Sequence, residues 1–359
     1  MNTLNELIVD SCHAGLVLQN RDTGAMPAGH NGPYFDSETP VRNTSHWVLT
    51  FLKGHEISGE ERLLAAAGRA IDYLCSPEAR PMGHAFHHRL NPEKDSCNGL
   101  IGQAWSCEAL IYAGEYLNRR DVIELAEEVF LMHPFDEESG LWRRLAVDGM
   151  YLPFDPTFNH QLWFGAIGAQ MSNYSRVVKQ RTDCFMEKLS RHLRTYRSGL
   201  IYHPLLFRSG WKERAKDLKR MLTERSSQRR RLAEKAVGYH LFNLYAFGLL
   251  KEVYPDHRFW REQSFVKALK FASKPGFHAA LETNSYGFPY NPPGFEMAMA
   301  MDRFGFGDEE QQSRWVSRQI EQCWDPESGL MNRMGEDPVT QAARLYEAVR
   351  LQNVSLSPT

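Results

Sequence analysis

Two kinds of helical pattern alternate along the chain. One kind is apolar almost all round and rich in small residues, which indicates helices buried on most sides; it covers residues 44–56, 98–116, 159–171, 237–253, 295–304 and 339–351. The other kind has one apolar and one charged face, which is typical of helices that cover a core; it covers residues 3–17, 60–74, 121–132, 175–193, 260–272 and 309–323. The pattern predicts six inner and six outer helices.

A glycine turn followed by a short apolar run recurs between these helix pairs. The segment from Asp136 to Arg144 returns with small changes from Asp325 to Arg333, and weaker copies lie elsewhere. The turn glycines of the six copies are Gly24, Gly83, Gly140, Gly199, Gly276 and Gly329, at spacings of 59, 57, 59, 77 and 53 residues. Repeats of this length indicate one supersecondary unit that stacks on its neighbours.

Inner and outer helices in six such units predict an all-α (α/α)6 toroid, with short β-like turns between the helical hairpins. The helix at 3–17 would pair with the C-terminal helix and close the ring. An open helical solenoid is the structural alternative, and a parallel sheet is disfavoured because strands are too few. We expect a single domain over residues 1–359 instead of the two that its length suggests.

The longest spacing contains a basic insertion at residues 208–235. It carries eleven Lys and Arg residues against four Asp and Glu, whereas the whole chain has 42 against 44 and a net charge of −2. We interpret it as a lid or flap. It would be solvated, cover an anionic substrate, or contact a partner or membrane surface.

Composition and targeting signals narrow the function classes. A hydrophobic content of 42% excludes wholesale disorder, and the charge balance disfavours a globally basic nucleic-acid binder. The sequence contains neither an apolar run long enough to cross a bilayer nor a secretory signal. The six cysteines form no Cys-x-x-Cys pair, which indicates free thiols in a reducing compartment. We therefore expect a cytoplasmic protein.

The starts of the inner helices are unusually polar and aromatic. In a toroid they face one end of the central cavity, where free N–H groups and the helix dipoles favour anions. Asn residues there could also be helix caps, and the His residues could belong to the core. The candidate substrate-binding residues are Arg42, His46, Trp47, His88, Asn98, Trp105, Trp163, His240, Glu296 and Arg344.

The start of the third inner helix carries the most specific motif. Asn159 and His160 with Trp163 resemble the Asn-Asn-His-x-x-Trp segment of alginate lyases of polysaccharide lyase family five, although Phe158 replaces the first Asn. The resemblance implies a helical toroid that acts on uronic acids. Asn159 would hold the substrate carboxylate, His160 would take the C5 proton, and a tyrosine would protonate the leaving oxygen.

Removal of the C5 proton from a uronic acid requires a base and a group that neutralises the carboxylate. The C5 proton of a uronic acid is weakly acidic, so the carboxylate must be neutralised and a base of near-neutral pKa must reach C5. Protonation of the glycosidic oxygen then gives β-elimination, whereas return of a proton to the other face gives epimerisation. Tyr239, Tyr286 and Tyr290 are the candidate proton carriers. We expect a lyase or C5-epimerase acting on an anionic glycan.

Three alternatives remain. A glycoside hydrolase resembling unsaturated glucuronyl hydrolases would use paired carboxylates from Asp36, Asp95, Asp155 and Glu296. A sugar 2-epimerase resembling the N-acylglucosamine 2-epimerase group would use paired histidines. A helical-repeat scaffold would need no polar cavity at all.

No cofactor is expected, because the sequence lacks a phosphate-binding glycine fingerprint. It also lacks the Gly-x-Ser-x-Gly motif of serine hydrolases. His84 and His88 have a metal-compatible spacing, but Gly83 argues against a helix there, so no metal is expected either.

Overall fold

The computed structural model describes residues 2–205, 226–288 and 290–356. The basic insertion predicted at 208–235 therefore falls largely outside the described residues. Its described part is helix α9 (Ser226–Gly238).

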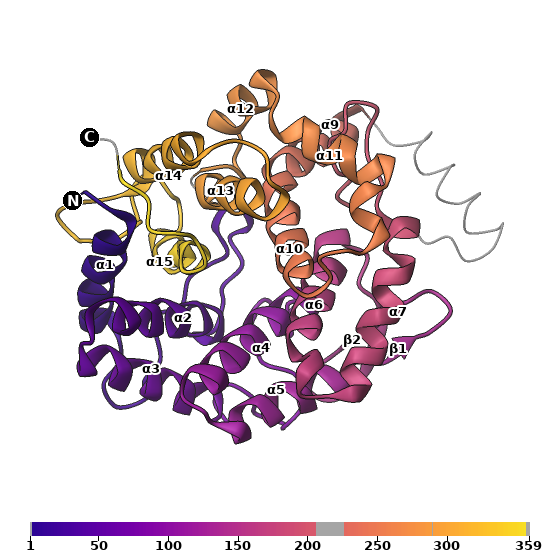
Figure 1. Ribbon diagram of the computed structural model, residues 1–359. Helices are drawn as coiled ribbons and strands as arrows, with labels where there is room; N and C mark the ends of the chain where they lie inside the picture. Colours follow the sequence, from indigo (N-terminus) through magenta and orange to yellow (C-terminus); the bar gives the residue numbers. More distant parts are fainter. Residues whose placement is uncertain (1, 206–225, 289, 357–359) are drawn as a thin grey trace.

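The inner helices form a closed ring, which is viewed along its axis in Figure 1. Each inner helix packs against the next, and the last packs against both α13 and α2. The members are α2 (Val41–Ser58), α4 (Gly99–Tyr116), α6 (Phe158–Gln170), α10 (His240–Val253), α13 (Pro293–Phe304) and the short pair α15 (Pro338–Ala343) and η4 (Arg344–Ala348). The predicted all-α (α/α)6 toroid is confirmed.

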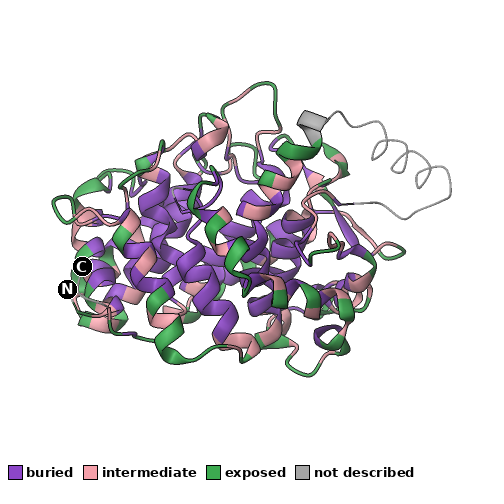
Figure 2. Ribbon diagram, turned by 90° about the horizontal axis from the view of Figure 1, so that it is seen from above, coloured by how far each residue is buried: buried purple, intermediate pink, exposed green. Residues whose placement is uncertain are grey.

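The outer helices surround this ring and expose their charged faces. They are α1 (Leu4–Leu18), α3 (Glu61–Leu74), α5 (Arg120–Met132), α7 (Arg176–His192), α11 (Gln263–Ala272) behind the turn η3 (Arg258–Arg261), and α14 (Glu309–Cys323). Figure 2 shows the burial that separates the two layers. The apolar face of the outer layer and nearly the whole surface of the inner helices therefore supply the core.

Both ends of the chain meet where the ring closes. The backbone N–H of Leu4 donates to the carbonyl of Val354 at 3.1 Å, and that of Leu356 donates to Asn2 at 2.8 Å. The continuous ring supports our proposal that the chain forms one domain. Among the described residues, no helix combines the length and apolarity needed to cross a membrane.

The structure contains the predicted glycine turn in five of the six copies. Gly24, Gly83, Gly140, Gly199 and Gly329 have φ between +68° and +103°, a conformation that other residues rarely adopt. The turn predicted at Gly276 is wrong, because Pro275 begins a short helix there, α12 (Pro275–Glu282). The extended segments form one antiparallel sheet, β1 (Phe135–Asp136), β2 (Leu141–Leu145) and β3 (Tyr151–Phe154), and isolated bridges.

All inner helices begin at the same end of the ring, so the connections that precede them lie together. Remaining short elements are η1 (Gly32–Tyr34) in the first connection and η2 (Met171–Asn173) at the opposite end. Contacts that link neighbouring connections are Glu38–Arg89, Asp95–Arg144, Thr157–Pro204, Glu234–Ser285 and His30–Asp337. These linked connections form a polar rim around the starts of the inner helices.

Candidate active site

A cavity of about 260 Å³ lies inside this rim. Its lining comes from the first turns of α4, α6 and α10, from the connections before them, and from η1, α9 and η4. A pocket where several elements converge with charged and aromatic side chains is the default candidate for a binding site.

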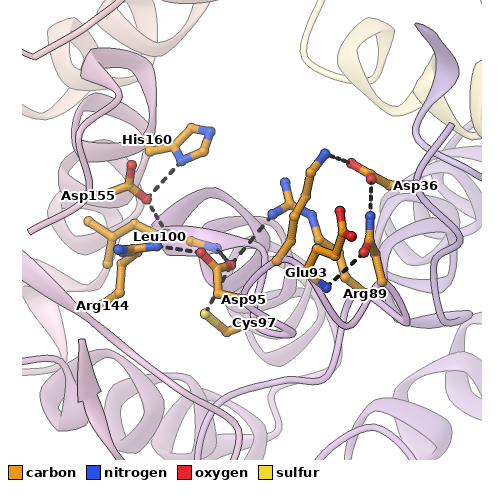
Figure 3. Close-up of polar contacts among 12 residues, drawn as sticks. Asp36, Arg89, Glu93, Asp95, Cys97, Leu100, Arg144, Asp155 and His160 are labelled. Carbon is orange, nitrogen blue, oxygen red and sulfur yellow. Dashed lines mark hydrogen bonds and ion pairs between the residues drawn. The ribbon is translucent and has the colours of Figure 1, made fainter. Parts of the chain in front are cut away.

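His160 and Asp155 form a hydrogen-bonded pair at one wall of the cavity (Figure 3). His160 Nδ1 lies 2.8 Å from Asp155 Oδ2. The carboxylate also accepts hydrogen bonds from the backbone N–H groups of Leu100 at 3.0 Å and Thr157 at 3.1 Å. Burial raises the pKa of Asp155, but His160 and these donors outweigh it and lower that pKa below its usual value. Asp155 is thus ionised, so Nδ1 of His160 donates to it and Nε2 is free to act as a base.

A second histidine, His203, lies in the same cavity. Its Nδ1 is buried and has no hydrogen-bond partner among the described residues. Burial, together with the nearby Lys235 and His160, lowers the pKa of His203 to about 3. His203 is therefore a neutral imidazole, and its ring centroid lies 4.9 Å from that of Tyr239.

Four tyrosines form an aromatic wall next to His203: Tyr34, Tyr239, Tyr286 and Tyr290. The hydroxyls of Tyr34 and Tyr239 are 2.9 Å apart, and that of Tyr290 donates to Asn31 Oδ1 at 2.8 Å. Burial raises the pKa of both Tyr34 and Tyr239 well above its ordinary value. Their hydroxyls are thus protonated at neutral pH and can donate.

The lining of the cavity carries five Lys and Arg side chains and two Asp side chains. Four of its five Lys and Arg side chains have carboxylate partners: Arg89 and Arg144 with Asp95, Lys94 with Asp36, and Arg344 with Glu347 and Glu296. Lys235 has no carboxylate partner among the described residues, and its ammonium nitrogen lies 4.5 Å from the ring centroid of Tyr34. Burial, Arg231 and Lys94 all lower the pKa of Lys235. An anionic group in the cavity would relieve this unfavourable environment.

Half of the predicted site residues line the cavity. They are Asn98, Trp105, Asn159, His160, Tyr239, Tyr290 and Arg344. Asn159 is buried, and its Oδ1 accepts no hydrogen bond within the described part of the chain. The catalytic roles assigned to Asn159, His160, Tyr239 and Tyr290 stay predictions.

The other predicted binding residues do not line this cavity. Arg42, His46 and Glu296 lie behind it: Arg42 lies 4.4 Å from the Trp105 ring centroid, His46 stacks on Tyr346, and Glu296 contacts Arg344. The remaining four, which are hydrogen-bonded or packed in the interior, are Trp47, His88, Trp163 and His240. Only some positions of an inner helix can face the cavity, because successive residues turn towards neighbouring helices.

Two of the four carboxylates considered for a hydrolase line the cavity. Asp95 and Asp155 line the cavity but are held by Arg144 and His160. Asp36 and Glu296 do not line it. Among the described residues, no group of three or more His, Cys, Asp or Glu is arranged to hold a metal ion.

Several cavity residues were not singled out from the sequence, above all His203, Arg144 and Lys235. The sequence repeat marks two of these residues, Arg144 and His203. Arg144 and His203 each stand four residues after a turn glycine, Gly140 and Gly199. Aligning the copies by glycine would have placed both at one level of the toroid.

Comparison with solved structures supports the architecture. The chain is similar to a cellobiose 2-epimerase from Bacillus thermoamylovorans (10% identity, TM-score 0.64, 96% of this chain and 98% of that one). It is also similar to a D-mannose isomerase (13%, 0.62, 97% of each chain) and to an α-1,6-mannanase from Salegentibacter (12%, 0.58, 96% and 98%). At these identities the likeness shows the fold alone. None of it supports the resemblance to alginate lyases.

No family model matches the sequence. A curated relative does: archaeal glycosylation protein Q of Haloferax volcanii is 44% identical over 369 aligned positions, which cover 99% of each chain. Identity at this level over nearly the whole of both chains shows that the two proteins are members of one family. The protein belongs to the family of archaeal glycosylation protein Q.

Proposed function

We propose that the protein is a carbohydrate epimerase that exchanges the C5 proton of a uronic acid belonging to a glycan. The observation that carries the proposal is the His160–Asp155 pair, which shares its cavity with hydrogen-bonded tyrosines and with Lys235. A glycosylation protein as relative and sugar epimerases among the proteins of similar fold also support it.

Each group has a part in the proposed reaction. His160 takes the C5 proton through Nε2, and Asp155 stabilises the imidazolium that forms. Negative charge then moves onto the substrate carboxylate, where Lys235 stabilises it. The hydroxyl of Tyr239 returns a proton to the opposite face of C5, and Tyr34 donates a hydrogen bond to the resulting phenolate. Proton exchange with water restores His160 and Tyr239.

β-Elimination is the first alternative for the same residues, with Tyr239 protonating the glycosidic oxygen instead. Proton transfer at C2 of a neutral sugar is the second, and the epimerase and isomerase of similar fold favour it. Lys235, which has no carboxylate partner among the described residues, favours an acidic sugar over a neutral one, because a neutral substrate supplies no counter-charge for the ammonium.

Incubation with uronates in deuterated water tests the proposal. We expect deuterium at C5 and conversion to the C5 epimer, followed by NMR, without the ultraviolet absorbance of an unsaturated product. Appearance of that absorbance would instead establish the lyase. Deuterium at C2 of neutral sugars, with none at C5 of uronates, would contradict the proposal.

Lys235→Met should raise KM for a uronate substrate by about tenfold or more, since a hydrogen bond to a charged group contributes about 1.5–3 kcal/mol. Lys267→Met, an exposed position on α11, serves as the matched control and should leave KM unchanged. Steady-state kinetics of both variants give the two KM values. Equal KM values for Lys235→Met and the native protein would remove Lys235 from the site.

Gly99→Ala should strongly lower activity, because Gly99 packs directly against the catalytic pair. A Cβ at this position would lie 2.3 Å from Asp155 Oδ2 and 2.9 Å from His160 Nδ1. Gly59→Ala is the control: its φ of +70° resembles the +58° of Gly99, yet nothing lies within 4 Å of its Cβ. Both variants should lose about 1–2 kcal/mol of stability from backbone strain. A loss of activity shared by both would argue against a specific effect on the pair.

A further inference from the structure

The floor of the cavity is closed by packed side chains. Trp105 and Arg344 line it, and Arg42 lies directly behind Trp105 with no exposed surface. His46 stacks on Tyr346 with ring centroids 4.0 Å apart and meets the Trp105 ring edge-on at 5.3 Å. Although Figure 1 shows an open centre between the ribbons, these buried side chains block the axis of the ring.

The walls are closed by contacts between neighbouring connections. On one side, Asp95 pairs with both Arg144 and Arg89 (Figure 3). Elsewhere on the wall, the hydroxyls of Tyr34 and Tyr239 touch at 2.9 Å, and Lys235 lies over Tyr34. Within the described residues these contacts close the wall where they lie, and the cavity opens at the rim.

The volume is correspondingly small. About 260 Å³ falls below the range of about 300–1,000 Å³ that is usual for ligand pockets. A cavity of this size suits one sugar ring better than a run of rings.

The number of glycosidic bonds on a sugar determines how many openings its pocket must have. An internal unit of a linear glycan carries glycosidic bonds to two neighbours, so it needs two ways out of its pocket. A free sugar needs none and a chain-terminal sugar needs one. We infer that the protein accepts only a free or chain-terminal acidic sugar and rejects internal units. This inference rests on the proposed function for the acidic character of that sugar, but the shape argument is independent of the reaction.

Binding and exchange should be measured separately to test the inference. The probes are glucuronate and its 1,4-linked disaccharide and tetrasaccharide. Saturation-transfer NMR with the folded His160→Ala variant reports which ring contacts the protein, and position-resolved deuterium incorporation by the native protein reports which ring reacts. We expect saturation and deuterium in the terminal ring alone. Saturation of internal rings as strong as that of the terminal ring would overturn the inference.

The two proposals fail in different ways. Saturation confined to the terminal ring without any deuterium uptake would refute the proposed reaction and leave the terminal-ring inference standing. Deuterium in internal rings would support the reaction and refute the inference. Absence of saturation from every probe would refute the inference that this pocket takes an acidic sugar.

Discussion

Replacing His160 with alanine should lower kcat for C5 proton exchange by about 10²–10⁴, the usual contribution of a positioned general base. The reason is structural: Asp155 holds the imidazole through Nδ1 at 2.8 Å, which leaves Nε2 as the basic atom in the cavity. The rate of deuterium incorporation at C5, measured at saturating substrate, gives the effect directly.

Two further variants test whether the loss of activity is specific to the His160–Asp155 pair. Asp155→Asn should lower kcat with little change in KM, since an amide no longer fixes the tautomer of His160 or stabilises its charged form. His13→Ala removes a partly exposed histidine that pairs with Glu60 on the outer layer, and it should leave kcat unchanged. Native exchange rates in His160→Ala would show that another group is the base.

Glu38→Ala should lower the free energy of unfolding by about 3–5 kcal/mol, because it leaves a buried charge uncompensated. Glu38 and Arg42 have fully buried side chains, with nitrogen and oxygen 3.4 Å apart. Arg42 keeps its hydrogen bond to Asn31 at 2.7 Å, but that neutral acceptor cannot replace a carboxylate. Urea denaturation, followed by circular dichroism, measures the change.

The chain offers a matched control for this variant. Glu124 and Arg120 have the same spacing in the sequence and a similar separation of 3.2 Å, but both side chains are more than half exposed. Glu124→Ala should cost no more than about 1 kcal/mol, as usual for surface pairs. If the two variants lose the same stability, burial of the Glu38–Arg42 pair has no energetic consequence.

The architecture could be predicted from the sequence because helix burial leaves a periodic trace. The ranges 98–116 and 309–323 agree with α4 and α14 to within one residue. The range 339–351 fits less well, since α15 passes into a 3-10 segment at Arg344. Gly276 lies in a helix and not in a turn; glycine occurs in both, and Pro275 is the local signal for the helix start.

The site was harder to predict, for two physical reasons. Inner helices such as α2 and α4 are buried on nearly all sides, so periodicity cannot tell whether Arg42 of α2 or Trp105 of α4 faces the cavity or a neighbouring helix. In addition, Arg89, Arg144 and His203 lie in connections, whose path depends on tertiary contacts and not on local pattern. The starts of the inner helices could be identified as the chemical end of the toroid; the residues that the rim contributes could not.

The closed ring also affects how the protein unfolds. In an open array of repeats, the terminal units have one neighbour each and fray first, so stability is nearly a sum over local pieces. Here the first helix is held to the last segment through Leu4 and Val354, and every inner helix has two neighbours. Loss of any one unit therefore exposes two interfaces at once, which makes partial opening costly. Ring closure thus converts a repeat protein into a single cooperative unit.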